Sequence, residues 1–232
     1  MTRSRTPSQT APGPVLWPVA GAAAGLFSVL LGIAGGLLET ALSGPWPATG
    51  DPAYGPFLAR NRGPVLAQSM FFVLGQAALV CFLGWVWARL LRAEGAPGTV
   101  SAVAFGAGFM AAALNIAGQG VQLVLTMPAA ASMDAATASA VTDLCVVLLA
   151  LANLPLAVSF AAVAALSLAR GAYPRWLGGI AAGAAVAALL SVLSLVPTAG
   201  PLSPMGGLTT ALRLVPLLWY LPAAVVMLRS RS

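Results

Sequence analysis

The sequence predicts an all-α integral membrane bundle of six transmembrane helices with both termini in the cytoplasm. Of its 232 residues, 59% are hydrophobic and only 7% are charged, too few to cover a soluble domain of this size. The apolar residues fall into six runs, each long enough to cross about 30 Å of hydrocarbon as a helix. All eleven basic residues are arginines, and nearly all of them lie at the ends of these runs, which indicates the orientation.

The first run extends from Val15 to Leu38. Residues 1–14 are rich in Ser, Thr, Pro and Gln and predict a disordered cytoplasmic arm, so residues 15–232 form a single six-helix domain. A secretory signal cleaved near Ala41-Leu42-Ser43 is the alternative, although the apolar run exceeds the roughly 7 to 15 residues of such signals. A stripe of small residues predicts close packing inside the bundle or, alternatively, a homodimer through this helix; it consists of Gly21, Gly25, Ser28, Gly32 and Gly36.

The other five runs are separated by turn-forming Gly and Pro residues. They extend from Val65 to Leu90, Val100 to Thr126, Val141 to Leu168, Leu177 to Val196 and Leu208 to Leu228. Three prolines inside these runs, which are Pro155, Pro216 and Pro222, predict kinks because proline cannot donate a helical hydrogen bond.

Arginine placement predicts which side each loop faces, because cytoplasmic loops of membrane proteins are enriched in Lys and Arg. A cytoplasmic N-terminus puts eight arginines inside, namely Arg3, Arg5, Arg89, Arg92, Arg170, Arg175, Arg229 and Arg231. It puts only Arg60 and Arg62 outside, and it leaves Arg213 within the sixth run. The expected location is therefore the plasma membrane with both termini cytoplasmic.

The composition excludes several kinds of chemistry. Histidine is absent, which removes imidazole bases and most zinc or haem sites. The carboxylates lack metal-ligand spacing, so no metal and no cofactor are expected. The sequence pI of about 10.7 reflects arginines dispersed at helix ends and indicates membrane topology rather than nucleic-acid binding. The two cysteines, Cys81 and Cys145, should lie at different depths and are not expected to form a disulfide.

The strongly polar side chains inside the runs concentrate in the outer half of the predicted bilayer. Asn115, Gln119 and Gln122 are spaced by four and three residues, which places them on one helical stripe. Polar groups at this depth usually face a partner or a wet cavity. The candidate ligand-binding residues are Gln76, Asn115, Gln119, Gln122, Asp143, Asn153 and Arg213. The alternatives are a polar clamp between helices or snorkelling of Arg213 to the headgroups.

The junction from Leu168 to Gly179, with the sequence LARGAYPRWLGG, resembles one in bacterial multi-pass membrane proteins of the domain-of-unknown-function 4386 type. The long loop after the first helix is similar to that group as well. The Ala and Gly bias departs from its Leu- and Ile-rich pattern. The resemblance implies an integral membrane protein without an assigned chemistry.

Three functions remain open from the sequence. The first is a non-enzymatic protein whose outer-leaflet polar pocket binds or helps to move a small or amphipathic ligand. The second is a structural or accessory membrane subunit in which the polar groups only join helices. The third is a membrane-embedded enzyme that uses Asp143 or Glu39 as an acid or base on a lipidic or isoprenoid substrate. Apart from these two carboxylates, the sequence indicates no catalytic residue for such an enzyme.

Reporter fusions test the predicted topology. Fusions after Arg92, Arg175 and Ser232 should report cytoplasm, and fusions near Ala48, Ala131 and Ala199 should report the exterior, because the arginine bias is eight to two. The reverse pattern would overturn both the topology and the outer-half placement of the polar residues.

Overall fold

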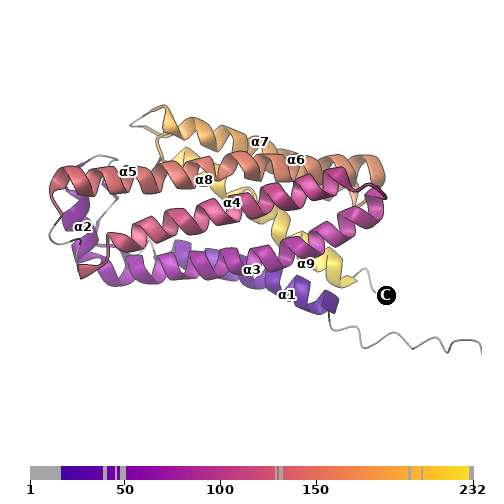
Figure 1. Ribbon diagram of the computed structural model, residues 1–232, viewed down its shortest axis with the longest axis horizontal. Helices are drawn as coiled ribbons and strands as arrows, with labels where there is room; N and C mark the ends of the chain where they lie inside the picture. The colour runs from indigo at the N-terminus through magenta and orange to yellow at the C-terminus, as the bar shows by residue number, and fades with distance from the viewer. Residues whose placement is uncertain are drawn as a thin grey trace, which may run out of the picture.

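The computed structural model describes residues 17–38, 41–44, 46–47, 51–128, 130, 133–197, 200–204 and 206–229, and this part of the chain is built from helices and turns (Figure 1). The helices are α1 (Trp17–Leu38), α2 (Tyr54–Arg60), α3 (Arg62–Glu94), α4 (Thr99–Val124), α5 (Ala135–Leu151), α6 (Asn153–Arg170), α7 (Arg175–Val192), η3 (Leu193–Leu195), α8 (Gly207–Leu214) and α9 (Leu217–Arg229). The predicted arm and Glu39 lie outside the described residues.

The six predicted runs are confirmed as six helical segments long and apolar enough to cross a membrane. Two of the segments are divided near a proline, into α5 and α6 and into α8 and α9, and a third continues from α7 into the 3-10 helix η3. The first break falls at Ala152, three residues before Pro155, and the second lies beside Pro216. Both follow from the missing proline N–H and the crowding of its ring against the preceding turn. Pro222 instead lies within the continuous helix α9.

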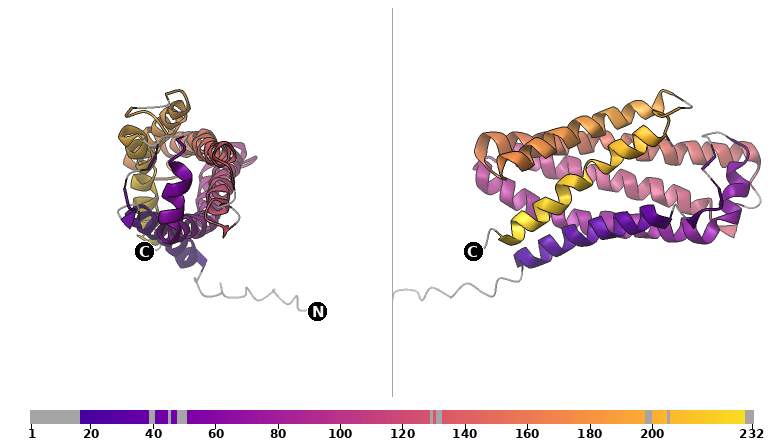
Figure 2. Two further views of the ribbon diagram at one scale, coloured as in Figure 1. Left: turned by 90° about the vertical axis from the view of Figure 1, so that its left-hand side faces the viewer. Right: turned by 180° about the vertical axis from the view of Figure 1, so that it is seen from behind.

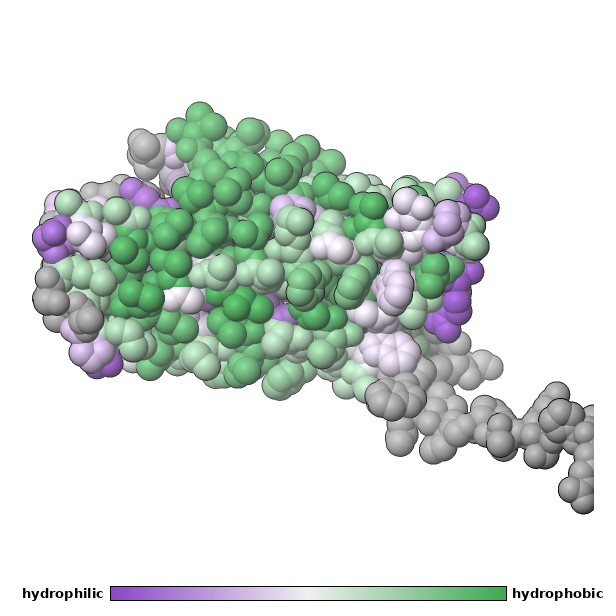
Figure 3. All heavy atoms as spheres, viewed as in Figure 1, coloured by the Kyte–Doolittle hydropathy of each residue, from purple (hydrophilic) through white to green (hydrophobic). Residues whose placement is uncertain are grey.

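The two ends of the bundle carry different numbers of arginines. The start of α1 and the end of α9 lie at one end, together with the α3–α4 and α6–α7 turns (Figures 1 and 2). Five described arginines belong to helix termini at this end: Arg89, Arg92, Arg170, Arg175 and Arg229. Arg60 and Arg62 lie at the opposite end, where α2 crosses the bundle (Figure 2). Apolar side chains cover the middle of the face in Figure 3, as expected for a surface that meets lipid.

The core centres on an aromatic cluster, which we define as Phe82, Phe160, Tyr173, Trp219 and Tyr220. Trp219 is 1% exposed, and its ring lies 5.5 Å from that of Phe160 and 5.4 Å from that of Tyr173, both edge-on. The rings of Phe82 and Tyr220 pack edge to face at 6.2 Å. These rings come from α3, α6, the α6–α7 turn and α9, so the cluster joins four parts of the chain.

The α6–α7 turn is tied to this cluster by Arg89. Its Nε donates a 2.7 Å hydrogen bond to the carbonyl of Ala172, and its guanidinium lies 4.7 Å from the centre of the Tyr173 ring. The Tyr173 hydroxyl in turn approaches Met227 Sδ at 3.7 Å. Gly171 ends α6 with φ +69°, which glycine adopts without strain. The junction noted in the sequence therefore connects α3, α6, α7 and α9.

The small residues of α1 divide into two groups. A Cβ added at Gly21 or Gly25 would lie within 2.6 Å of the Trp85 or Phe82 ring, so these glycines let α1 approach α3 closely. A Cβ at Gly32 or Gly36 would meet nothing within 4 Å. Close packing against α3 therefore requires glycine at only the first part of the predicted stripe.

Substitution of two glycines in α1 tests this division. Gly25→Ala should lower the free energy of unfolding by about 1 to 3 kcal/mol, because the new methyl overpacks against the fully buried Phe82 ring. Gly32→Ala, the matched control, should raise it by about 0.5 to 1 kcal/mol through helix propensity alone. Reversible unfolding in mixed micelles would measure both. Equal effects of the two changes would contradict the packing of α1 on α3.

Candidate functional site

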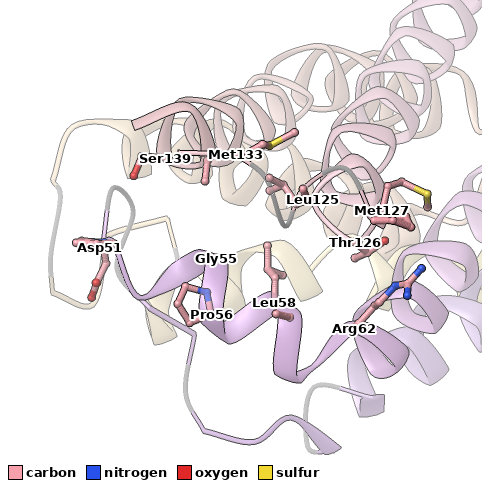
Figure 4. A pocket seen from close by; sticks show the side chains of 15 residues that line it. Asp51, Gly55, Pro56, Leu58, Arg62, Leu125, Thr126, Met127, Met133 and Ser139 are labelled. Carbon is pink, nitrogen blue, oxygen red and sulfur yellow. The ribbon is translucent and has the colours of Figure 1, made fainter. Parts of the chain in front are cut away.

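A cavity of about 570 Å³ opens at the end of the bundle that carries α2 (Figure 4). Four parts of the chain form its walls: α2 with the turn before it, the first residue of α3, the residues that follow α4, and the start of α5. The lining residues are Asp51, Pro52, Gly55, Pro56, Leu58, Ala59, Arg62, Leu125, Thr126, Met127, Pro128, Ala130, Met133, Ala138 and Ser139.

The α2 wall is held in place by Asn61, which is only 1% exposed. Its side-chain Nδ2 donates to the carbonyl of Phe57 at 3.0 Å, and its Oδ1 accepts a 2.7 Å hydrogen bond from the backbone N–H of Ser43. Phe57 and Leu58 are buried with Val65 and Leu125 in a small apolar core beneath the cavity. The loop after α1, α2 and the end of α4 therefore form one packed unit.

The α5 wall begins with a side-chain cap. The Asp134 carboxylate accepts a 2.7 Å hydrogen bond from the backbone N–H of Thr137 and so caps the start of α5 at Ala135. This hydrogen bond lowers the pKa of Asp134 below its usual value. The cap keeps the first turn of α5, with Ala138 and Ser139, in place along the cavity.

The cavity surface is mostly apolar with a few polar groups. Leu58, Leu125, Met127 and Met133 provide flexible apolar side chains. Asp51 and Arg62 lie at opposite ends of it in Figure 4. Thr126 and Ser139 add hydroxyl groups from the turn after α4 and from α5, and the Thr126 hydroxyl donates to the Leu123 carbonyl at 2.8 Å. Such a surface suits a ligand with an apolar body and a polar end.

None of the seven residues predicted from the sequence lines this cavity. Gln122 lies one turn below Thr126 on α4 and Gln119 a further turn below, and both are buried, at 8% and 6% exposure. Asp143 lies one turn below Ser139 on α5 and is half-buried. Polar side chains therefore continue from the cavity floor into the membrane-spanning part along α4 and α5.

The two helices that carry Asn115, Gln119, Gln122 and Asp143 pack against each other. A Cβ at Gly118 would lie 2.8 Å from Leu149 and 3.5 Å from the Cys145 carbonyl, so α4 and α5 are in close contact here. Arg213 lies on α8, which packs against α7.

The other predicted residues are less connected. Gln76 is half-buried on α3, next to Gly75, which lies against Ser28 and Leu31 of α1 rather than against α4 or α5. Asn115 donates to the Ala111 carbonyl of its own helix at 3.2 Å. Asn153 donates to the carbonyls of Leu149 and Ala150, both at 3.1 Å, where α5 gives way to α6. The side-chain amides of Asn115 and Asn153 therefore donate to carbonyl groups of the adjacent helical turn.

Several buried polar atoms accept or donate no hydrogen bond among the described residues. They include Gln119 Oε1, Asp143 Oδ1, Ser194 Oγ and Thr209 Oγ1. Leaving such a group unsatisfied costs about 1 to 3 kcal/mol, so water or a ligand is the expected partner. Ser194 and Thr209 could not be singled out from the sequence, because Ser and Thr in apolar helices often bond to their own backbone, as Ser191 does to Ala187.

The cavity itself was also missed, since α2 is a seven-residue helix without a long apolar run. The available signal was the pair of arginines, Arg60 and Arg62, on the side of the membrane where arginine is otherwise rare.

No protein-family model matches the chain, and no curated protein or solved structure matches it significantly. Cys81 and Cys145 are both free thiols, the first exposed and the second buried. Within the described residues, no three His, Cys, Asp or Glu side chains gather closely enough to hold a metal ion.

A double-mutant cycle tests whether Asp143 is the counter-ion of Arg213, which stays a prediction. Removing one partner of a buried ion pair costs about 3 to 5 kcal/mol, whereas an exposed pair contributes about 0 to 1 kcal/mol. We expect Arg213→Ala and Asp143→Ala each to be strongly destabilising and the double mutant to lose far less than their sum. Additive losses in unfolding free energy would show that the two residues are not coupled.

Proposed function

We propose that this protein is a multi-pass protein of the bacterial plasma membrane, with both termini in the cytoplasm, that binds or helps to move a small or amphipathic ligand at its extracytoplasmic end. The resemblance to the domain-of-unknown-function 4386 type is part of this proposal. The observation that carries it is the cavity beneath α2, with polar side chains continuing below it along α4 and α5.

The dimensions of the bundle support a ligand from the outer membrane surface. Helix α3 has 33 residues and is therefore about 50 Å long, whereas the hydrocarbon is about 30 Å thick and the bilayer with headgroups about 40 to 45 Å. With Arg89 at the inner boundary, the first turns of α3 extend to the outer headgroups. The cavity would then be reached both from the exterior and from the outer leaflet.

The size and surface of the cavity support a small amphipathic ligand. Its volume of about 570 Å³ falls within the roughly 300 to 1,000 Å³ of small-molecule sites. Four apolar side chains, Leu58, Leu125, Met127 and Met133, can hold an acyl or ring system. Charged and hydroxyl groups at the rim can orient a polar end.

A structural or accessory subunit is the second candidate. It is favoured by Asn115 and Asn153, whose amides donate to carbonyls of their own helices and so need no ligand. An acid/base enzyme using Asp143 is a weaker alternative, supported only by the buried Oδ1 atom that accepts no hydrogen bond from the described residues.

Cysteine labelling distinguishes these candidates. In a background with Cys81 and Cys145 replaced by Ala, Ala138→Cys in the cavity wall should react with a membrane-impermeant maleimide added from outside. An amphipathic ligand that fills the cavity should block this reaction. We expect protection by at least one of decanoate, decanol and decylamine in nanodiscs, measured as the labelling rate.

Two control positions on α5 belong to this experiment. Ala136→Cys is exposed outside the cavity and should be labelled without protection by any amphipath. Leu144→Cys lies on the apolar outer surface of the span and should stay unreactive because lipid covers it. An unreactive Ala138→Cys, or one that no amphipath protects, would leave the structural subunit as the better function.

A further inference from the structure

We infer that the cavity selects amphipathic anions, with Arg62 as the residue that binds the anionic group. This inference rests on the proposed ligand-binding function and names its ligand class. The anion can be the carboxylate of a single-chain amphipath or the phosphate of an outer-leaflet lipid, since both offer paired oxygens to a guanidinium.

The first support is the location of the charge. Among the described arginines, only Arg60 and Arg62 lie at the α2 end, and of these only Arg62 lines the cavity. Arginine on this side runs against the charge distribution of the rest of the chain. Arg62 therefore lies where the arginine distribution disfavours it and also lines the cavity, so we expect it to have a function in the cavity.

The second support is that the Arg62 guanidinium is available. It is exposed, and no other described side chain forms a hydrogen bond or ion pair with it. A guanidinium presents its donors in a planar fork that matches carboxylate and phosphate oxygens. Figure 4 shows Arg62 extending toward Met127 and Thr126 at one end of the cavity. The anionic group would bind there.

The third support is that the opposing charge is distant and already engaged. Asp51 lies at the other end of the cavity in Figure 4. Its Oδ1 accepts a 2.8 Å hydrogen bond from the backbone N–H of Ala53, which holds the turn into α2. Between the two charges lie Leu58, Leu125 and Met133, against which an apolar chain can pack. Arg62 has no partner among the described side chains, whereas the Asp51 carboxylate already accepts a hydrogen bond. This difference favours an anionic amphipath over a cationic one.

The test compares three amphipaths that differ only in their head group. In phosphatidylcholine nanodiscs, decanoate should protect Ala138→Cys from labelling at a concentration about tenfold lower than decanol, because a charge-assisted hydrogen bond is added in a partly open site. Decylamine should protect least. Adding Arg62→Gln should remove the advantage of decanoate and leave decanol unchanged.

Arg60→Gln is the matched control, since Arg60 is exposed on the same short segment but does not line the cavity. It should preserve the preference for decanoate. Replacing part of the lipid with phosphatidylglycerol identifies the source of the anion: protection without added decanoate, lost in Arg62→Gln, indicates a lipid phosphate, and unchanged labelling indicates a free carboxylate.

The outcomes separate the two proposals. Equal protection by all three amphipaths, or an unchanged preference for decanoate in Arg62→Gln, would overturn the anion inference while ligand binding stands. Stronger protection by decylamine would assign the selectivity to Asp51 instead and would overturn it as well. Protection by none of the three would mean that the proposed function itself fails.

Discussion

Helices inside a bilayer gain little from the hydrophobic effect when they associate, so tight van der Waals packing has to hold this bundle together. Trp219 is where that packing converges. It comes from α9, which crosses the bundle obliquely, and its ring contacts Phe160 of α6 and Tyr173 of the α6–α7 turn. The same cluster includes Phe82, against which Gly25 lets α1 settle. Almost every span is therefore connected through one group of rings.

Hydrogen bonds between helices and turns supplement this packing. Ser159 donates to the Ala104 carbonyl at 2.7 Å, a direct bond between α6 and α4. Arg89 holds the α6–α7 turn through Ala172. The Glu94 carboxylate accepts from the backbone N–H groups of Val100 and Ser101 and so ties the α3–α4 turn to the start of α4. These bonds fix the end of the bundle that carries the aromatic cluster, and the cavity lies at the opposite end.

The architecture could be predicted from the sequence because hydropathy period and length translate directly into spans. Pro216 also marked a real helix boundary, while Pro222 did not, since neighbouring helices can accommodate a proline within a span. The cavity could not be predicted in this way. It is formed by α2 and by loop residues far apart in sequence, and no periodic pattern records which turns meet.

The polar residues show the same limit at the level of single side chains. Spacing placed Asn115, Gln119 and Gln122 on one stripe, but the stripe does not say which amides bond to their own helix. In the structure Asn115 does so, whereas Gln119 leaves a buried oxygen without a partner among the described residues. The two differ in burial, since Gln119 is 6% exposed beside Gly118, which contacts α5, whereas Asn115 is half-buried.

The position of Arg62 follows from the relation between helix length and bilayer thickness. A guanidinium inside the hydrocarbon costs at least about 2.5 to 3.5 kcal/mol, so an arginine beside an apolar cavity is tolerated only where the helix has left the lipid. The 33 residues of α3 provide that extra length. The start of α3 places α2 at the same end of the bundle as the end of α4 and the start of α5, and the cavity lies between them. An α3 longer than the hydrocarbon is thick therefore permits an arginine at the wall of this cavity.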